Sequence, residues 1–173
     1  MNPAEQAVAA VAAAGVRLSV AESLTGGMVS SLITDVPGSS AVFPGSVVSY
    51  SVGAKAQVLG VSAQLLADSG PVHPTVARQM AQGVARLFAA EIAVATTGVA
   101  GPEAHGGFPP GVVVIGWFAE GETGAVAGQF LGDRHEIRVR TAEAALAAIT
   151  HCAVYGLVRD ELAPPSGYFP VRE

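Results

Sequence analysis

The sequence is poor in lysine: of its nine Lys and Arg residues, Lys55 is the single lysine. The other cationic side chains are arginines, whose guanidinium keeps its proton in proteins. A lysine amine loses its proton more readily, because burial lowers its pKa. The position that holds the one lysine is therefore a candidate for acid–base chemistry. The alternative is a surface lysine left over in a composition that favours Ala, Gly, Val and Arg.

Cysteine and charge are scarce as well. The single Cys152 excludes an internal disulfide and is compatible with a reducing compartment. It lies deep in a predicted helix without basic neighbours, which indicates a core residue. Charged residues make up 13% of the chain and the net charge is -5, so the sequence lacks the basic stripe that nonspecific binding of nucleic acid requires. No apolar run reaches transmembrane length. We therefore expect a cytoplasmic protein that binds neither nucleic acid nor a membrane.

Apolar residues, in contrast, make up 50% of the chain, enough for one domain with a single core. Apolar or alternating runs predict buried strands at residues 16–21, 42–50 and 91–97, and a β-hairpin whose strands are 112–119 and 125–131. Helices are predicted at 4–14, 28–33, 53–59, 62–68, 75–90 and about 133–158. The helix over 75–90 has one apolar side, formed by Val76, Met80, Val84, Leu87 and Phe88. Helices that alternate with buried strands, plus one hairpin, predict a three-layer α/β/α sandwich with a mixed sheet.

The strongest site candidate is the segment 21–27, which reads AESLTGG, where a predicted strand runs into a helix. Two glycines allow a backbone to approach a ligand closely, and the free N–H groups of a helix start suit an anion or an oxyanion. Ser23 would lie at the carboxyl end of the strand, where open α/β sheets place ligands. The alternative is an ordinary strand–helix turn in which Ser23 or Thr25 caps the helix.

A serine nucleophile needs a base, and the four histidines are scattered without an obvious serine partner or metal-ligand spacing. Lys55 is the remaining candidate, at the end of the next strand–turn unit. A neutral lysine amine can take the serine proton and return it to a leaving amine. Tyr50 is close enough in sequence to hold the lysine or relay a proton, or it is a packing residue at a strand end.

Two further segments are candidates. The residues 97–103 read TGVAGPE and open a Gly/Pro-rich loop that extends to Gly111, longer than a simple connection needs. Its alternative role is a rigid crossover. Arg134 and Arg138 lie at i and i+4 on the last predicted helix, which suits a phosphate or a carboxylate. The alternative is a solvated face paired with Glu136 or Glu143.

These motifs together resemble the CinA C-terminal domain family, whose stand-alone members include nicotinamide mononucleotide deamidases of the PncC type. The resemblance spans residues 5–155 and rests on AESLTGG, PGSSAVF at 37–43, YSVGAK at 50–55, TGVAGP at 97–102 and GDRHEIR at 132–138. It implies a three-layer fold with a mixed, mostly parallel five-stranded sheet. We expect residues 1–160 to form that single domain and residues 161–173 to form a proline-containing tail.

The resemblance also implies a function, namely hydrolysis of the carboxamide of nicotinamide mononucleotide to the acid and ammonia. It implies no metal and no cofactor, a small-molecule nucleotide substrate, and a homodimer or larger homo-oligomer. Ser23 is then the nucleophile, Lys55 the general base and Tyr50 a supporting residue. The residues expected to bind substrate are Glu22, Thr25, Gly26, Gly27, Thr97, Gly98, Ala100, Gly101, Arg134 and Arg138, the two arginines being candidates for the phosphate.

The sequence departs from the family pattern around the expected pocket. Val52 and Gly53 stand where polar residues are usual, Ser46 replaces a common glycine, and Phe108-Pro109-Pro110 replaces Lys-Pro-Val. These changes leave two alternatives open: a serine–lysine amidase for another small amide, or a catalytically silent ligand-binding or interaction domain. Retention of both Ser23 and Lys55 favours an enzyme.

Overall fold

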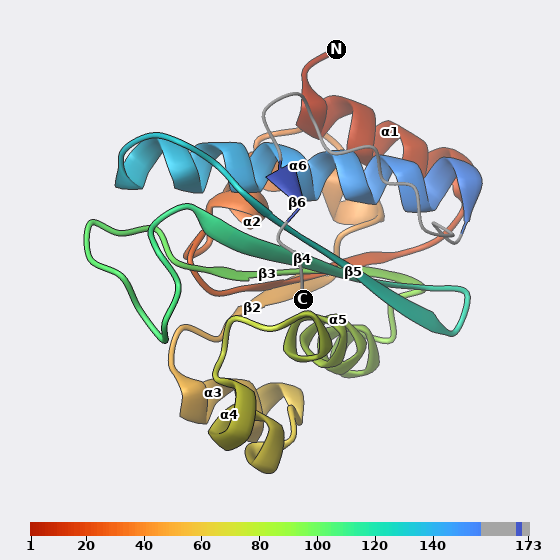
Figure 1. Ribbon diagram of the computed structural model, residues 1–173. Helices are drawn as coiled ribbons and strands as arrows, with labels where there is room; N and C mark the ends of the chain where they lie inside the picture. The colour runs from red at the N-terminus through yellow and green to blue at the C-terminus, as the bar shows by residue number, and fades with distance from the viewer. Residues whose placement is uncertain (157–168, 171–173) are drawn as a thin grey trace.

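The computed structural model describes residues 1–156 and the two-residue strand Phe169–Pro170, and in them a sheet lies between two layers of helices (Figure 1). The strands are β1 (Leu18–Glu22), β2 (Gly45–Val48), β3 (Ile92–Gly98), β4 (Val112–Ala119), β5 (Glu122–Gln129) and β6 (Phe169–Pro170). The helices are α1 (Pro3–Ala14), α2 (Met28–Thr34), α3 (Val52–Leu59), α4 (Ala63–Ser69), α5 (Pro74–Phe88) and α6 (Arg134–Tyr155), with a short 3-10 turn at Ser39–Ala41.

The strand order is β2-β1-β3-β4-β5-β6. Strands β2 and β3 pair with β1 in parallel, whereas β3–β4 and β4–β5 are antiparallel. The predicted three-layer fold with a mixed five-stranded sheet is confirmed, and β6 adds a short strand beside β5. Among the first five strands only β4 runs opposite to the others, since it returns along β3 and β5 returns along β4 in a hairpin.

The hairpin is tighter than predicted. Only Glu120 and Gly121 connect its strands, both with positive φ, 53° and 85°, so β5 begins at Glu122 instead of residue 125. This is the backbone that a two-residue turn needs to match the twist of the strands. The expected tail over residues 161–173 lies outside the described residues, apart from β6, as does the predicted end of the last helix at residues 157–158.

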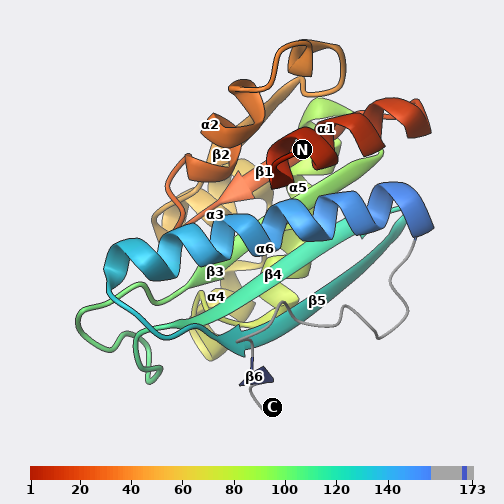
Figure 2. The ribbon, with the colours of Figure 1, turned by 90° about the horizontal axis from the view of Figure 1, so that it is seen from above.

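Side-chain alternation divides β3 between two cores. On β3, Val94 packs beneath α1, α2 and α6, whereas its neighbours Ala93 and Ala95 pack beneath α5. Figure 2 shows α1 and α6 side by side on the first face. On the other face α5 lies very close to β4, because Gly116 has no side chain; a Cβ there would lie 2.4 Å from the main chain of Ala77.

Helix ends follow the sequence signals. Asn2 and Asp133 cap α1 and α6 through reciprocal capping boxes with Glu5 and Glu136. Val76, Met80 and Val84 of α5 are fully buried as predicted. Leu87 is 54% exposed, so its predicted burial is wrong. It lies in the last turn of α5. The spacing of apolar residues does not show where the elements packed against a helix end.

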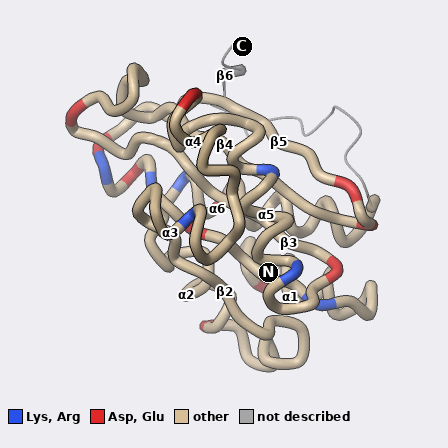
Figure 3. The backbone as a smooth tube through the Cα atoms, turned by 90° about the horizontal axis from the view of Figure 1, so that it is seen from below, with Lys and Arg blue, Asp and Glu red and all other residues tan. Residues whose placement is uncertain are grey.

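The surface carries few charges, and Figure 3 shows them spread over the chain without a basic stripe on the described residues. No helix in residues 1–156 is both long enough and apolar enough to cross a membrane. Cys152 is 3% exposed, in agreement with its predicted core position, and burial raises the pKa of its thiol to about 12.

Candidate active site

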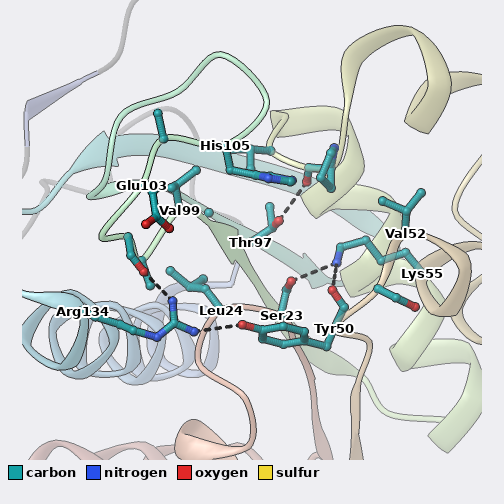
Figure 4. A pocket seen from close by; sticks show the side chains of 17 residues that line it. Ser23, Leu24, Tyr50, Val52, Lys55, Thr97, Val99, Glu103, His105 and Arg134 are labelled. Carbon is teal, nitrogen blue, oxygen red and sulfur yellow. Dashed lines mark hydrogen bonds between the residues drawn. The ribbon is translucent and has the colours of Figure 1, made fainter.

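A cavity of about 450 Å³ opens where β1 and β3 end (Figure 4). Its walls come from the turn after β1, the segment that leads from β2 into α3, the segment before α5, the end of β3 with the loop after it, and the first residue of α6. The volume lies within the range of small-molecule sites. The carboxyl ends of parallel strands are also the place where open α/β sheets bind ligands.

Strand alternation points Ser23 into this cavity. Its N–H donates to the carbonyl of Thr96 over 3.0 Å, so the pairing of β1 with β3 continues one residue past β1. Neighbouring side chains on a strand face opposite sides, and Glu22 therefore points toward α2 while Ser23 points toward α3. Ser23 is 8% exposed and lines the cavity; Glu22 is fully buried and does not.

Lys55 reaches Ser23 from α3, which begins after Ser51, whose side chain accepts the N–H of Ala54. Lys55 Nζ donates to Ser23 Oγ over 2.9 Å, to the carbonyl of Ser49 over 2.8 Å and to the carbonyl of Tyr50 over 3.4 Å. The side chain is 1% exposed. Burial lowers the pKa of Lys55 from 10.5 to about 8, so a substantial part of the amine is neutral under mildly alkaline conditions.

Tyr50 and Arg134 connect two walls of the cavity. The hydroxyl of Tyr50 accepts a 3.0 Å hydrogen bond from Arg134, and only the main-chain carbonyl of Tyr50 contacts Lys55. Arg134 also donates to the carbonyl of Gly101 over 2.6 Å. Gly101 has φ +82°, and a Cβ there would lie 2.9 Å from Pro110, so the loop needs glycine at this position.

The end of β3 supplies the wall opposite Tyr50. The hydroxyl of Thr97 donates to the carbonyl of Pro71 over 2.8 Å, which joins this wall to the segment before α5. The neighbouring Thr96 faces the other way and bonds to Thr25 over 2.8 Å, again because side chains alternate. Eight of the residues expected at the site line the cavity: Ser23, Tyr50, Lys55, Thr97, Gly98, Ala100, Gly101 and Arg134.

Five expected site residues do not line the cavity: Glu22, Thr25, Gly26, Gly27 and Arg138. The predicted anion site at the start of α2 is taken by the protein itself, because the carboxylate of Glu22 accepts the N–H groups of Gly27, Val29 and Ser30. The cap position of α2 is Gly27, not Ser23 or Thr25. Arg138 donates to the carbonyls of Leu24 and Thr25 over 3.0 and 2.8 Å and so holds the turn after Ser23 from outside the cavity.

The cavity also contains residues that the sequence did not single out as site residues. Val52, noted above as a departure, lines it, whereas Phe108–Pro110 do not. His105 lines the cavity as well, held by main-chain bonds with Phe108, and the exposed Glu103 also lines it (Figure 4). The sequence feature that could have indicated both His105 and Glu103 is the unusual length of the Gly/Pro-rich loop. The remaining additional residues are Leu24, Ser51, Pro71, Val72, Val99 and Ala104.

Within the described part of the chain, no group of three or more His, Cys, Asp or Glu side chains is arranged to hold a metal ion. At the site a buried amine is in contact with a hydroxyl. Lys55 can accept a proton from Ser23, and Arg134 presents a positive charge at the other end of the cavity (Figure 4).

Comparisons with known proteins by sequence and by structure all identify the same family. A family model described as the CinA C-terminal domain matches residues 2–153. A CinA-like protein of Anaeromyxobacter sp. (strain K) is 46% identical over 145 residues, which cover 82% of this chain and 35% of that protein. A competence-damage inducible protein of Bacillus velezensis is 45% identical over 129 residues, 75% of this chain and 31% of that protein. The chain thus spans about a third of the length of these curated relatives.

Solved structures of similar size also match. The crystal structure of a competence-damaged protein (CinA) superfamily protein from Klebsiella pneumoniae has a TM-score of 0.84 and 33% identity, covering 90% of this chain and 99% of that chain. A member of the same superfamily from Escherichia coli has a TM-score of 0.79 and 30% identity, over 83% of this chain and 87% of that chain.

Proposed function

Because the chain belongs to the CinA C-terminal domain family, we propose that it is a nicotinamide mononucleotide deamidase, an amidohydrolase that forms nicotinate mononucleotide and ammonia. The observation that carries the proposal is the 2.9 Å contact between Ser23 Oγ and Lys55 Nζ inside the cavity. A buried lysine with a lowered pKa beside a serine hydroxyl is the arrangement that activates serine without histidine.

The reaction follows from this pair. Ser23 Oγ attacks the carboxamide carbon while neutral Lys55 takes the hydroxyl proton. The N–H groups of the turn after Ser23 are the candidates to stabilise the oxyanion. Lys55 then gives the proton to the amide nitrogen, the C–N bond breaks and ammonia leaves. Water, deprotonated by Lys55, attacks the acyl-enzyme, the product acid departs, and Ser23 regains its proton from Lys55.

Arg134 is the proposed phosphate contact. It lies at the side of the cavity away from Lys55, and its guanidinium has five N–H donors. Two protein acceptors, the Tyr50 hydroxyl and the Gly101 carbonyl, fix its orientation. A guanidinium held in this way remains positively charged and can bind a phosphate with little further loss of side-chain conformational entropy. Arg138 does not share this role, because its donors bind the carbonyls of Leu24 and Thr25.

A serine–lysine amidase for another small amide is the second candidate, favoured by one observation. Glu103 lines the same cavity as Arg134, and a carboxylate there disfavours a phosphate. A catalytically silent binding domain fits less well. Burial of the Lys55 amine beside Ser23 lowers the stability of the fold, and ligand binding alone gives no reason for this cost. We further propose that the protein acts in the cytoplasm as a homodimer or larger homo-oligomer.

The test is ammonia release from nicotinamide mononucleotide by the wild type, Ser23→Ala and Lys55→Arg. We expect turnover by the wild type and a loss of about 100-fold or more in both variants. Arginine keeps the positive charge but not the titratable amine. Absence of turnover by the wild type would exclude this substrate. Turnover of nicotinamide riboside in place of the mononucleotide would favour the second candidate.

A further inference from the structure

Glu22 carries a carboxylate that is completely buried and has no cationic partner among the described residues. The one ion pair found there joins Arg17 and Glu91 at the surface. A buried charge without a counter-ion is costly unless hydrogen bonds replace its water. Glu22 has such bonds: Oε2 accepts the N–H groups of Gly27 and Val29 over 2.9 and 3.1 Å, and Oε1 accepts the N–H of Ser30 over 2.9 Å and its hydroxyl.

The main chain of the same residue connects to both members of the Ser23–Lys55 pair. Ser23 is the next residue along the chain. The carbonyl of Glu22 accepts the N–H of Ser49 over 2.8 Å, and the carbonyl of Ser49 accepts Lys55 Nζ over 2.8 Å. A rotation or shift of Glu22 therefore moves Ser23 directly and moves the acceptor of Lys55 through one hydrogen bond.

We propose that Glu22 is a positioning residue for the Ser23–Lys55 pair: its carboxylate fixes the end of β1 to the start of α2 and thereby sets the distance between the two reacting groups. The inference rests on the serine–lysine chemistry proposed above. It replaces the expectation that Glu22 contacts the substrate, since the side chain points away from the cavity.

The geometry explains why a carboxylate of this length is needed. Four donors from Gly27, Val29 and Ser30 converge on two oxygens, and each oxygen takes two of them. Aspartate keeps the charge but is one methylene shorter, so it cannot reach all four donors without pulling the end of β1 toward α2. Displacing a catalytic group by 1 Å costs about 100-fold in rate.

The test uses phenylmethylsulfonyl fluoride, which needs no knowledge of the natural substrate. Ser23 Oγ bonds to sulfur, fluoride leaves, and the hydroxyl proton passes to Lys55; mass spectrometry of the intact chain follows the reaction. The variants are Glu22→Asp, which keeps the charge, and Ser30→Ala, which removes one donor and leaves the rest. Ser30→Thr retains the hydroxyl and serves as the conservative rescue. Asn2→Ala removes the cap of α1, far from the cavity, and controls for loss of stability alone.

We expect sulfonylation of Ser23 to slow by about 10-fold or more in Glu22→Asp and about 3-fold in Ser30→Ala, with Ser30→Thr and Asn2→Ala near the wild-type rate. Where the wild type turns over the mononucleotide, kcat falls by similar factors and KM stays within about twofold.

Wild-type rates in folded Glu22→Asp and Ser30→Ala overturn the inference, as does a rise in KM with kcat unchanged. A wild type whose Ser23 is not sulfonylated overturns it together with its premise. A wild type that is sulfonylated but leaves the mononucleotide intact refutes only the proposed substrate.

Discussion

Arg134 donates one hydrogen bond to the hydroxyl of Tyr50 and another to the carbonyl of Gly101, so a single guanidinium joins the segment before α3 to the loop after β3. The two walls it connects belong to parts of the chain about fifty residues apart. The hydroxyl of Tyr50 is directed to Arg134 and not to Lys55, which favours a role in binding over a proton relay.

Tyr50→Phe is therefore expected to change substrate binding more than chemistry. Loss of one hydrogen bond to a charged group costs about 1.5–3 kcal/mol when the group is buried, and less at this partly exposed position. We expect KM for the mononucleotide to rise about threefold, with kcat within about twofold of wild type. Steady-state kinetics measures both. A fall in kcat of about 100-fold would instead place the hydroxyl in proton transfer.

Arg134 and Arg138 form a matched pair, since both are arginines in the first turns of α6. Arg134→Ala is expected to raise KM by about 10-fold or more through loss of a phosphate contact, with little change in thermal stability. Arg138→Ala is expected to lower the free energy of unfolding by about 2–3 kcal/mol, because two carbonyls lose a charged donor, with KM within about twofold. Kinetics and thermal denaturation of both variants separate the roles; the opposite assignment of effects would contradict the site described above.

The pH dependence of kcat/KM is expected to reflect Lys55. The base must be neutral, and burial places the pKa of Lys55 at about 8, so activity rises through that pH and then reaches a plateau. Because the chain has one lysine, ¹³C labelling of lysine gives one side-chain signal whose chemical shift follows this titration directly. A midpoint near 10.5 by NMR would contradict the burial of the amine. A kinetic midpoint far from the NMR value would exclude Lys55 as the base.

The lowered pKa also predicts how stability changes with pH. The unfolded chain has the ordinary value of 10.5 and the folded chain about 8, so between these values the unfolded state binds more protons. The free energy of unfolding therefore rises from pH 8 to 10.5, by up to about 3 kcal/mol from this group, and the full penalty is present below pH 8. Lys55→Met should accordingly be more stable than wild type at pH 7, with a difference that shrinks toward pH 10.5. Denaturant unfolding at several pH values measures it; a Lys55→Met variant less stable than wild type at pH 7 would contradict the prediction.

Much of the fold could be predicted because its signals are local. Continuous apolar runs indicated β1 and β3, and Gly15 and Asp133, which cap α1 and α6, are residue types that commonly end or begin helices. Ser23 and Lys55 could be singled out for a chemical reason, since one is a hydroxyl at a glycine-rich helix start and the other is the single amine in a chain of arginines.

The direction of side chains at the end of β1 could not be predicted in the same way. Glu22 and Ser23 are adjacent, and the sequence does not show which helix covers which face of the strand. The same holds for Arg138, whose carbonyl partners lie more than a hundred residues earlier. Glu103 and His105 were missed because the loop has no periodicity from which side-chain directions follow.

The cavity is built from five separate stretches of chain between Ser23 and Arg134, none of which holds a reacting group and its partners alone. Contacts between such distant parts of a chain form slowly in folding, because each intervening loop must lose entropy before they form. Arg134 is the first residue of α6, so the contact that joins the cavity walls forms only when α6 docks on the sheet. Recovery of catalysis during refolding should thus lag behind recovery of helical signal, which makes the reaction a reporter of the last step of assembly.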